Sequence, residues 1–151
     1  MAGVSQPPDA DAVQAANLAF YAAFESRDID ALAAVWEHSD RVTVVHPGWP
    51  ILRGWGRVLA SFEAICANTA FMQFVLTDER VTIEGSTAWV TCEENLLQSV
   101  SSREGANDLG ELSGARVIAT NVFVRHAEGW RMVHHQGSPA PTGMPEEGDP
   151  V

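Results

Sequence analysis

Residues 42–62, VTVVHPGWPILRGWGRVLASF, predict a strand, a turn and a helix in immediate succession. The β-branched run at 41–46 is typical of a short strand that ends at His46, and the PGWP sequence after it is typical of a turn. After Gly54, apolar residues return at helical spacing and predict a helix over about 55–68. Because a residue before proline is restricted to extended backbone, the strand should aim His46 rigidly.

The segments on both sides extend this pattern. Before it, apolar residues recur every three or four positions over about 10–26 and 29–37, which predicts two antiparallel helices. After it, four runs of strand-forming residues predict consecutive antiparallel strands at 71–84, 87–100, 114–126 and 130–138. Helices first and strands afterwards indicate an α+β domain, with the helices on one face of a curved sheet.

Length and composition predict one globular domain. The 151 residues suit a single domain at 9–140, with a flexible arm at 1–8 and a flexible tail at 141–151. The polar stretch at 101–114 predicts an exposed hairpin loop. No apolar run approaches a membrane span and the first residues do not resemble a secretion signal, so we expect a cytoplasmic protein.

The charge balance limits the possible partners. The formal net charge is −11, and no basic cluster interrupts it, so neither nucleic acid nor a membrane is an expected partner. Cys66 and Cys92 lack the spacing of a metal or redox motif and are interpreted as buried apolar residues. Small neutral or cationic ligands stay compatible with this composition.

Three stretches carry a family resemblance: RDIDALAAVW at 27–36, the stretch at 42–62 quoted above, and ATNVFVRHAEGWRMVHHQGSP at 119–139. In order and in motif they resemble the nuclear transport factor 2-like superfamily, more narrowly its SnoaL-like members, over roughly 10–140. The resemblance implies a cone-shaped α+β fold: a curved, mixed or antiparallel sheet with three helices from the N-terminal half on its concave face. That scaffold hosts isomerases, cyclases, dehydratases, epoxide hydrolases and non-catalytic domains.

Within this superfamily, the resemblance to ketosteroid isomerase reaches three positions. Its general-base aspartate, which precedes a proline at the end of the first strand, is matched by His46. Its donor tyrosine is matched by Phe20, next to Tyr21, and its protonated aspartate is matched by Asn121. The residue types differ, so steroid isomerisation is not implied. The ending GWRMVHHQGSP resembles SnoaL-like members that close on a histidine run, whose third position is Gln136 here.

Strand alternation predicts which side chains face the cavity. On the last strand it places His134 on the same face as Trp130, Met132 and Gln136, and His135 on the opposite face. Because these adjacent histidines point apart, they cannot share a metal ion, and no metal is expected.

The strand at 87–100 carries two adjacent carboxylates. Alternation places Glu94 among apolar residues and Glu93 on the wetter side. A carboxylate on an apolar face requires a partner or a raised pKa. This assignment depends on the strand register.

The resemblance, together with these patterns, implies a hydrophobic, histidine-bearing cavity for a small apolar molecule, in which His46, Asn121, His134 and Glu94 converge. His46 is the candidate base or proton relay, Asn121 the candidate oxyanion donor, and Glu94 an acid or the orienting partner of His134. No cofactor is expected. The predicted binding residues are Phe20, Tyr21, Trp36, Trp49, Phe62, Trp130, Met132 and Gln136.

Three classes of function stay open at this stage. The protein is an isomerase, cyclase or hydrolase that works by proton transfer or water activation, a binding module without turnover, or an assembly domain that uses the outer face of its sheet. A homodimer through the open side of the sheet is expected. Each candidate also has a structural interpretation, with His46 as a hydrogen-bonded rim residue, Asn121 as a core amide and the aromatic residues as core.

Overall fold

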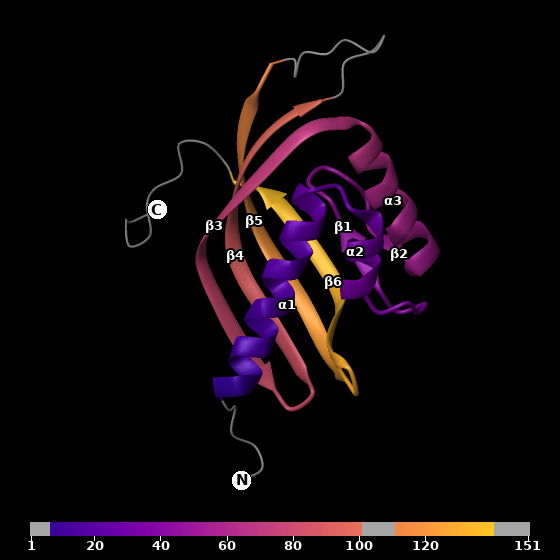
Figure 1. The fold of residues 1–151 in the computed structure, drawn as a ribbon, viewed down its shortest axis with the longest axis vertical. Helices are drawn as coiled ribbons and strands as arrows, with labels where there is room; N and C mark the ends of the chain where they lie inside the picture. Colours follow the sequence, from indigo (N-terminus) through magenta and orange to yellow (C-terminus); the bar gives the residue numbers. More distant parts are fainter. Residues whose placement is uncertain (1–6, 101–110, 141–151) are drawn as a thin grey trace.

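The computed structural model describes residues 7–100 and 111–140, and this part of the chain contains three helices and six strands (Figure 1). None of these helices is long and apolar enough to cross a membrane. Their order is α1 (Pro7–Glu25), α2 (Ile29–Val35), β1 (Thr43–Val45), β2 (Leu52–Arg53), α3 (Trp55–Ala67), β3 (Thr69–Glu84), β4 (Thr87–Val100), β5 (Ser113–His126) and β6 (Gly129–Pro139).

The strands form one mixed sheet with the order β2-β1-β6-β5-β4-β3. Strand β1 runs parallel to β6, and every other neighbouring pair is antiparallel. The sheet is curved and not closed, and the three helices gather on one of its faces (Figure 1). The predicted α+β fold is therefore confirmed.

The predicted elements lie within a few residues of their expected bounds. The sequence does not predict β2, because a pair of residues after a proline turn carries no alternation signal. The predicted tail and most of the predicted loop at 101–114 lie outside the described residues. Of the predicted arm at 1–8, only the last two residues are described, and they already belong to α1.

Local interactions fix the turn that follows β1. The amide of Trp49 donates to the carbonyl of His46 over 2.8 Å and closes the predicted turn. The chain then returns beside β1, where the Gly54 amide donates to the Val42 carbonyl over 2.8 Å. Gly54 has a φ of 91°, which residues with a side chain rarely adopt, and α3 begins at the next residue. His46 is thereby held between a strand and a closed turn.

The core lies between the helices and the concave face of the sheet. At its centre the ring of Phe20 packs against Phe62, with centroids 5.9 Å apart, and against Trp36 at 6.4 Å. All three side chains are almost completely buried. Aromatic pairs at such distances add stabilisation beyond the area that they bury.

A β-bulge interrupts the pairing of β5 with β6. Val122 pairs with His134 and the next residue of β5, Phe123, pairs with Met132, so Val133 is an extra residue on β6. An extra residue reverses the alternation of side chains beyond it. Trp130 and Met132 point inward before the bulge, whereas His135 and Gly137 are the buried residues after it.

Gly137 lies where two parts of the inner wall meet, and Gly137→Ala should test this packing. An added methyl group would lie 2.9 Å from Cγ1 of Val117 and 3.3 Å from Cγ of Pro47. We expect a loss of about 1–3 kcal/mol in the free energy of unfolding, measured by urea titration. Gly114→Ala is the matched control, since its methyl group would contact only the Leu96 carbonyl oxygen at 3.8 Å. Equal losses in both variants would contradict the close packing.

Candidate active site

A cavity of about 210 Å³ opens inside the cone. It is smaller than the pockets of roughly 300–1,000 Å³ that hold drug-sized ligands, so it suits a small molecule. Its polar lining consists of His46, Glu94, His135 and Gln98. Its apolar lining consists of Phe24, Pro47, Trp49, Ile65, Met72, Phe74, Leu96 and Val117.

His46 lies at the end of β1 with 3% of its surface exposed. Its Nε2 is 2.9 Å from Oγ of Ser61, and the Ser61 hydroxyl donates its own hydrogen to the Val58 carbonyl. Ser61 must therefore accept from Nε2–H of His46, which leaves a lone pair on Nδ1. Nδ1 has no hydrogen-bond partner within the described chain. Burial lowers the pKa of His46 to about 4, so its imidazole is neutral at pH 7.

His135 enters the same cavity from β6. Its Nδ1 lies 2.5 Å from Oδ1 of Asn121, which can only accept, so Nδ1 carries the hydrogen and Nε2 a lone pair. Nε2 is 4.0 Å from Oε2 of Glu94. Burial, followed by the charges that His46 and His134 could carry, lowers the pKa of His135 to about 3. A second neutral imidazole thus presents a lone pair to the cavity.

Buried amides behind the cavity wall fix this tautomer. The Nδ2 group of Asn121 donates to Oδ1 of Asn17 over 2.8 Å and to the Tyr21 hydroxyl over 3.1 Å. Its Oδ1 therefore faces His135 as an acceptor. Asn17 is oriented in turn because its Nδ2 donates to Oε2 of Glu79 over 2.9 Å. The network sets the direction of each hydrogen bond from Glu79 to His135.

Glu94 is the buried carboxyl group of the site, with 4% of its surface exposed. Its Oε2 accepts the Tyr21 hydroxyl over 2.5 Å. Burial raises the pKa of Tyr21, so that hydroxyl keeps its hydrogen. Burial also raises the pKa of Glu94 to about 7, although the hydrogen bond from Tyr21 opposes the rise. Glu94 can therefore donate or accept a proton near neutral pH.

The structure places the predicted catalytic candidates in different positions. His46 and Glu94 line the cavity, and Asn121 lies one hydrogen bond behind it. His134 does not face the cavity, because its Nδ1 is 2.6 Å from Oγ1 of Thr43 on the neighbouring strand. The bulge in β6 reverses the predicted alternation, and His135 takes the inner position instead.

The predicted binding residues also lie in different positions. Trp49 lines the cavity with 40% of its surface exposed, and its ring packs on His46 with centroids 4.9 Å apart. Tyr21 contributes its hydroxyl from behind the wall. Gln136 is exposed on the outer face, again because of the bulge. The remaining predicted contacts belong to the packed core or to its edge and not to the cavity lining: Phe20, Trp36, Phe62, Met132 and Trp130.

Trp130 lies at the far end of β6, beside the turn to β5. The guanidinium carbon of Arg125 is 4.7 Å from the centroid of its ring, and Arg125 also pairs with Asp9 of α1 over 3.0 Å. Alternation correctly predicts an inward direction for Trp130, but the inner face there is core rather than cavity. Its aromatic face therefore stabilises a surface arginine, and the residue does not border the cone cavity.

Several site residues are absent from the sequence-based hypothesis. His135 could be found only by locating the bulge, and Ser61 and Gln98 carry no signal of their own. Asn17 did carry a signal, because it falls on the apolar stripe of α1 between the buried residues Val13 and Phe20. A polar residue in such a stripe indicates a buried hydrogen-bond network.

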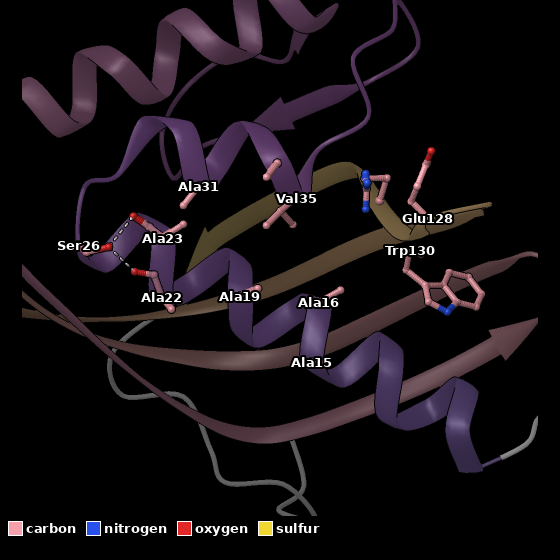
Figure 2. A pocket seen from close by; sticks show the side chains of 13 residues that line it. Ala15, Ala16, Ala19, Ala22, Ala23, Ser26, Ala31, Val35, Glu128 and Trp130 are labelled. Atoms are coloured by element: carbon pink, nitrogen blue, oxygen red, sulfur yellow. Dashed lines mark hydrogen bonds between the residues drawn. The ribbon is translucent and has the colours of Figure 1, made fainter.

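A larger groove of about 600 Å³ lies outside the cone, between α1, α2 and the turn from β5 to β6. Figure 2 shows that small side chains such as Ala19 and Ala23 line it, with Glu128 and Trp130 at one end. The Ser26 hydroxyl, at its other end, already donates to carbonyls of α1. The groove offers less acid–base chemistry than the cone cavity. Within the described residues, no group of three His, Cys, Asp or Glu side chains could hold a metal ion.

Comparison with known proteins places this geometry in a family. The family model for the SnoaL-like domain matches residues 13–142. A solved structure described as a "putative dehydratase from the NTF2-like family", from Streptomyces avermitilis, is 41% identical and superposes with a TM-score of 0.84, covering 91% of this chain and 100% of that chain. A second, described as a "putative calcium/calmodulin-dependent protein kinase type II association domain", from Thiobacillus denitrificans, is 31% identical with a TM-score of 0.70, covering 85% and 94%.

Among curated proteins, the F-box protein SKIP8 of Arabidopsis thaliana is 28% identical over 128 residues. The match covers 84% of this chain but 49% of that protein, so the chain spans about half the length of this relative. The family match extends over most of the chain and includes every residue that lines the cavity. The chain therefore belongs to the SnoaL-like domain family of the NTF2-like superfamily.

Proposed function

We propose that the protein is an enzyme that eliminates water from a small, largely apolar carbonyl compound bound in the cone cavity. One observation carries the proposal: a buried carboxyl group, Glu94, faces the same cavity as the imidazoles of His46 and His135, and its burial raises its pKa to about 7. Acid–base catalysis needs groups that hold and release protons near the working pH. Apolar walls around a few convergent polar groups are typical of small-molecule sites.

Elimination requires a base and an acid at the same time, and the cavity supplies both. The free Nδ1 of His46 would take the proton from the carbon next to the carbonyl group. The protonated Glu94 would give its proton to the departing hydroxyl group, so that the C–O bond breaks, a C=C bond forms and water leaves. Transfer of the proton from His46 back to Glu94, through water, restores the starting state. The centroids of the His46 and His135 rings are 6.3 Å apart, so both imidazoles border the same small space.

Similarity to a solved structure favours elimination over the other proton-transfer reactions. The Streptomyces protein described as a putative dehydratase is 41% identical over its whole length. Fold alone would not favour one reaction, because the same scaffold hosts unrelated chemistries. The combination of this relative with an acid and a base in one cavity supports water elimination over non-catalytic binding.

The test uses neutral β-hydroxy ketones in D₂O, beginning with the aldol of benzaldehyde and acetone, whose dehydration gives an enone that absorbs in the near ultraviolet. We expect growth of the enone absorbance, together with deuterium at the carbon next to the carbonyl in recovered substrate, because the base exchanges its proton with solvent. NMR of the recovered ketone measures the deuterium. Ketones that bind to the protein and yet show neither elimination nor exchange would contradict the proposal and favour a binding module.

A further inference from the structure

Three of the four polar side chains that line the cavity present hydrogen-bond acceptors, and the fourth, Gln98, carries an amide that can both donate and accept. The hydrogen of His46 is used by Ser61 and that of His135 by Asn121, so each ring offers a lone pair. Oε2 of Glu94 already accepts from Tyr21, and no described residue donates to its Oε1. A ligand that brings no donor would leave these acceptors buried without partners, which costs free energy.

The cavity also lacks a positive charge. The chain contains no lysine, and none of the described arginines belongs to the cavity lining. Arg41 and Arg125 are paired elsewhere, with Glu37 and Asp9. The net charge of −11 adds a long-range repulsion for anions. A carboxylate or phosphate in this cavity would therefore face lone pairs and a carboxyl group, with the neutral amide of Gln98 but no compensating cation.

We infer that this site selects uncharged molecules with an apolar body and a hydroxyl group, and that it rejects carboxylates and phosphate esters of the same shape. The inference rests on the proposed function in that it concerns the same cavity. The inferred selection concerns binding alone and requires no turnover, so it can be tested separately from the proposed function. The hydroxyl group of the ligand would donate to the lone pair of His46 or of His135, which stays free because Ser61 and Asn121 accept the other N–H of these rings.

Three probes with one benzene ring each separate these properties: benzyl alcohol, toluene and benzoate. Methionine methyl groups labelled with ¹³C report binding by NMR, because Met72 lines the cavity. Met132 is buried in the core outside the lining and serves as the internal control. In slightly alkaline buffer we expect benzyl alcohol to shift the Met72 signal with a Kd about tenfold lower than that of toluene, as one net hydrogen bond predicts. Benzoate should leave the signal unchanged at the same concentrations.

Two variants on β4 extend the test to the protein. Glu94→Gln removes the carboxylate but keeps its size, so it should admit benzoate and reduce the preference for benzyl alcohol over toluene. Glu93→Gln is the matched control, because Glu93 lies outside the cavity lining and pairs with Arg116 over 3.0 Å. This control should bind the three probes as the wild type does.

Each failure has a distinct meaning. Toluene that binds as tightly as benzyl alcohol, or benzoate that binds to the wild type, would overturn the inferred selection. No shift of Met72 with any probe would overturn it as well. Preference for benzyl alcohol without any elimination of β-hydroxy ketones would leave the inference standing and remove the proposed function. Elimination of water together with binding of benzoate would support the proposed function and overturn the inferred selection.

Discussion

Replacement of Glu94 by glutamine is expected to slow water elimination by about 10²- to 10⁴-fold, the range that general acid–base groups usually contribute. Glutamine matches the size of the carboxyl group and can still accept the Tyr21 hydroxyl, but it cannot supply a proton to the departing hydroxyl group. The measurement is kcat and kcat/KM for the aldol substrate across the neutral pH range. The wild-type profile should change near pH 7, where Glu94 titrates, and the variant should lose this change.

Glu93→Gln provides the matched comparison. The two glutamates are neighbours on β4, but Glu93 forms a partly exposed ion pair with Arg116 and lies outside the cavity lining. Such a pair contributes at most about 1 kcal/mol to stability, so this variant should keep both fold and rate. Both variants should show the circular dichroism of the wild type. A Glu94→Gln protein that eliminates water at the wild-type rate would show that Glu94 is not the acid.

The fold could be predicted from sequence because its signals are local. The stretch at 42–62 contains a strand run, a proline-glycine turn and a helical repeat, each of which acts within a few residues. The resemblance predicts a curved, mixed or antiparallel sheet, but neither the resemblance nor the pattern predicts the strand order. Nothing in the sequence indicates that β1 pairs in parallel with β6, ninety or so positions away, since pairing over such a distance leaves no periodic trace.

The site could be predicted only in part. Glu94 occupies the inner face as alternation indicates, because β4 keeps its register with β5 through this region. The alternation fails on β6, where one extra residue at Val133 exchanges His134 for His135. Periodicity also cannot separate a core contact from a cavity wall. Phe62 and Met72 are both buried, yet only Met72 borders the empty space.

The buried histidines make the stability of the protein depend on pH. The folded-state pKa values of about 4 for His46 and about 3 for His135 lie below the ordinary value of 6.5. Below pH 6.5 the unfolded chain takes up protons that the folded chain does not, so stability that is fully present above 6.5 is lost as the pH falls. Glu94 acts in the opposite direction: its raised pKa of about 7 gives a contribution that is full below the ordinary 4.5 and is lost as the pH rises through 7.

His135→Asn should isolate one of these contributions. When the pH falls from about 8 to 5, a histidine that stays neutral in the folded state lowers the free energy of unfolding by about 2 kcal/mol. The free energy of unfolding of the variant should therefore fall by about 2 kcal/mol less than that of the wild type over this interval. Asparagine keeps an amide N–H near the position from which Nδ1 donates to Asn121. Asparagine is smaller than histidine, so the variant is less stable at both pH values. This loss is the same at pH 8 and pH 5 and cancels when the urea titrations at the two pH values are subtracted.

The outcome bears on the chemistry as well as on stability. An equal acid loss in His135→Asn and the wild type would mean that His135 keeps its ordinary pKa of 6.5 in the folded protein and takes up a second proton as the pH falls below that value. Once charged, His135 would present Nε2 as a donor to Oε2 of Glu94 across 4.0 Å, and this positive partner would hold the carboxyl group ionised. In that state Glu94 could not act as the acid and a carboxylate ligand would find a cation in the cavity, so both the proposed reaction and the inferred selection depend on a neutral His135.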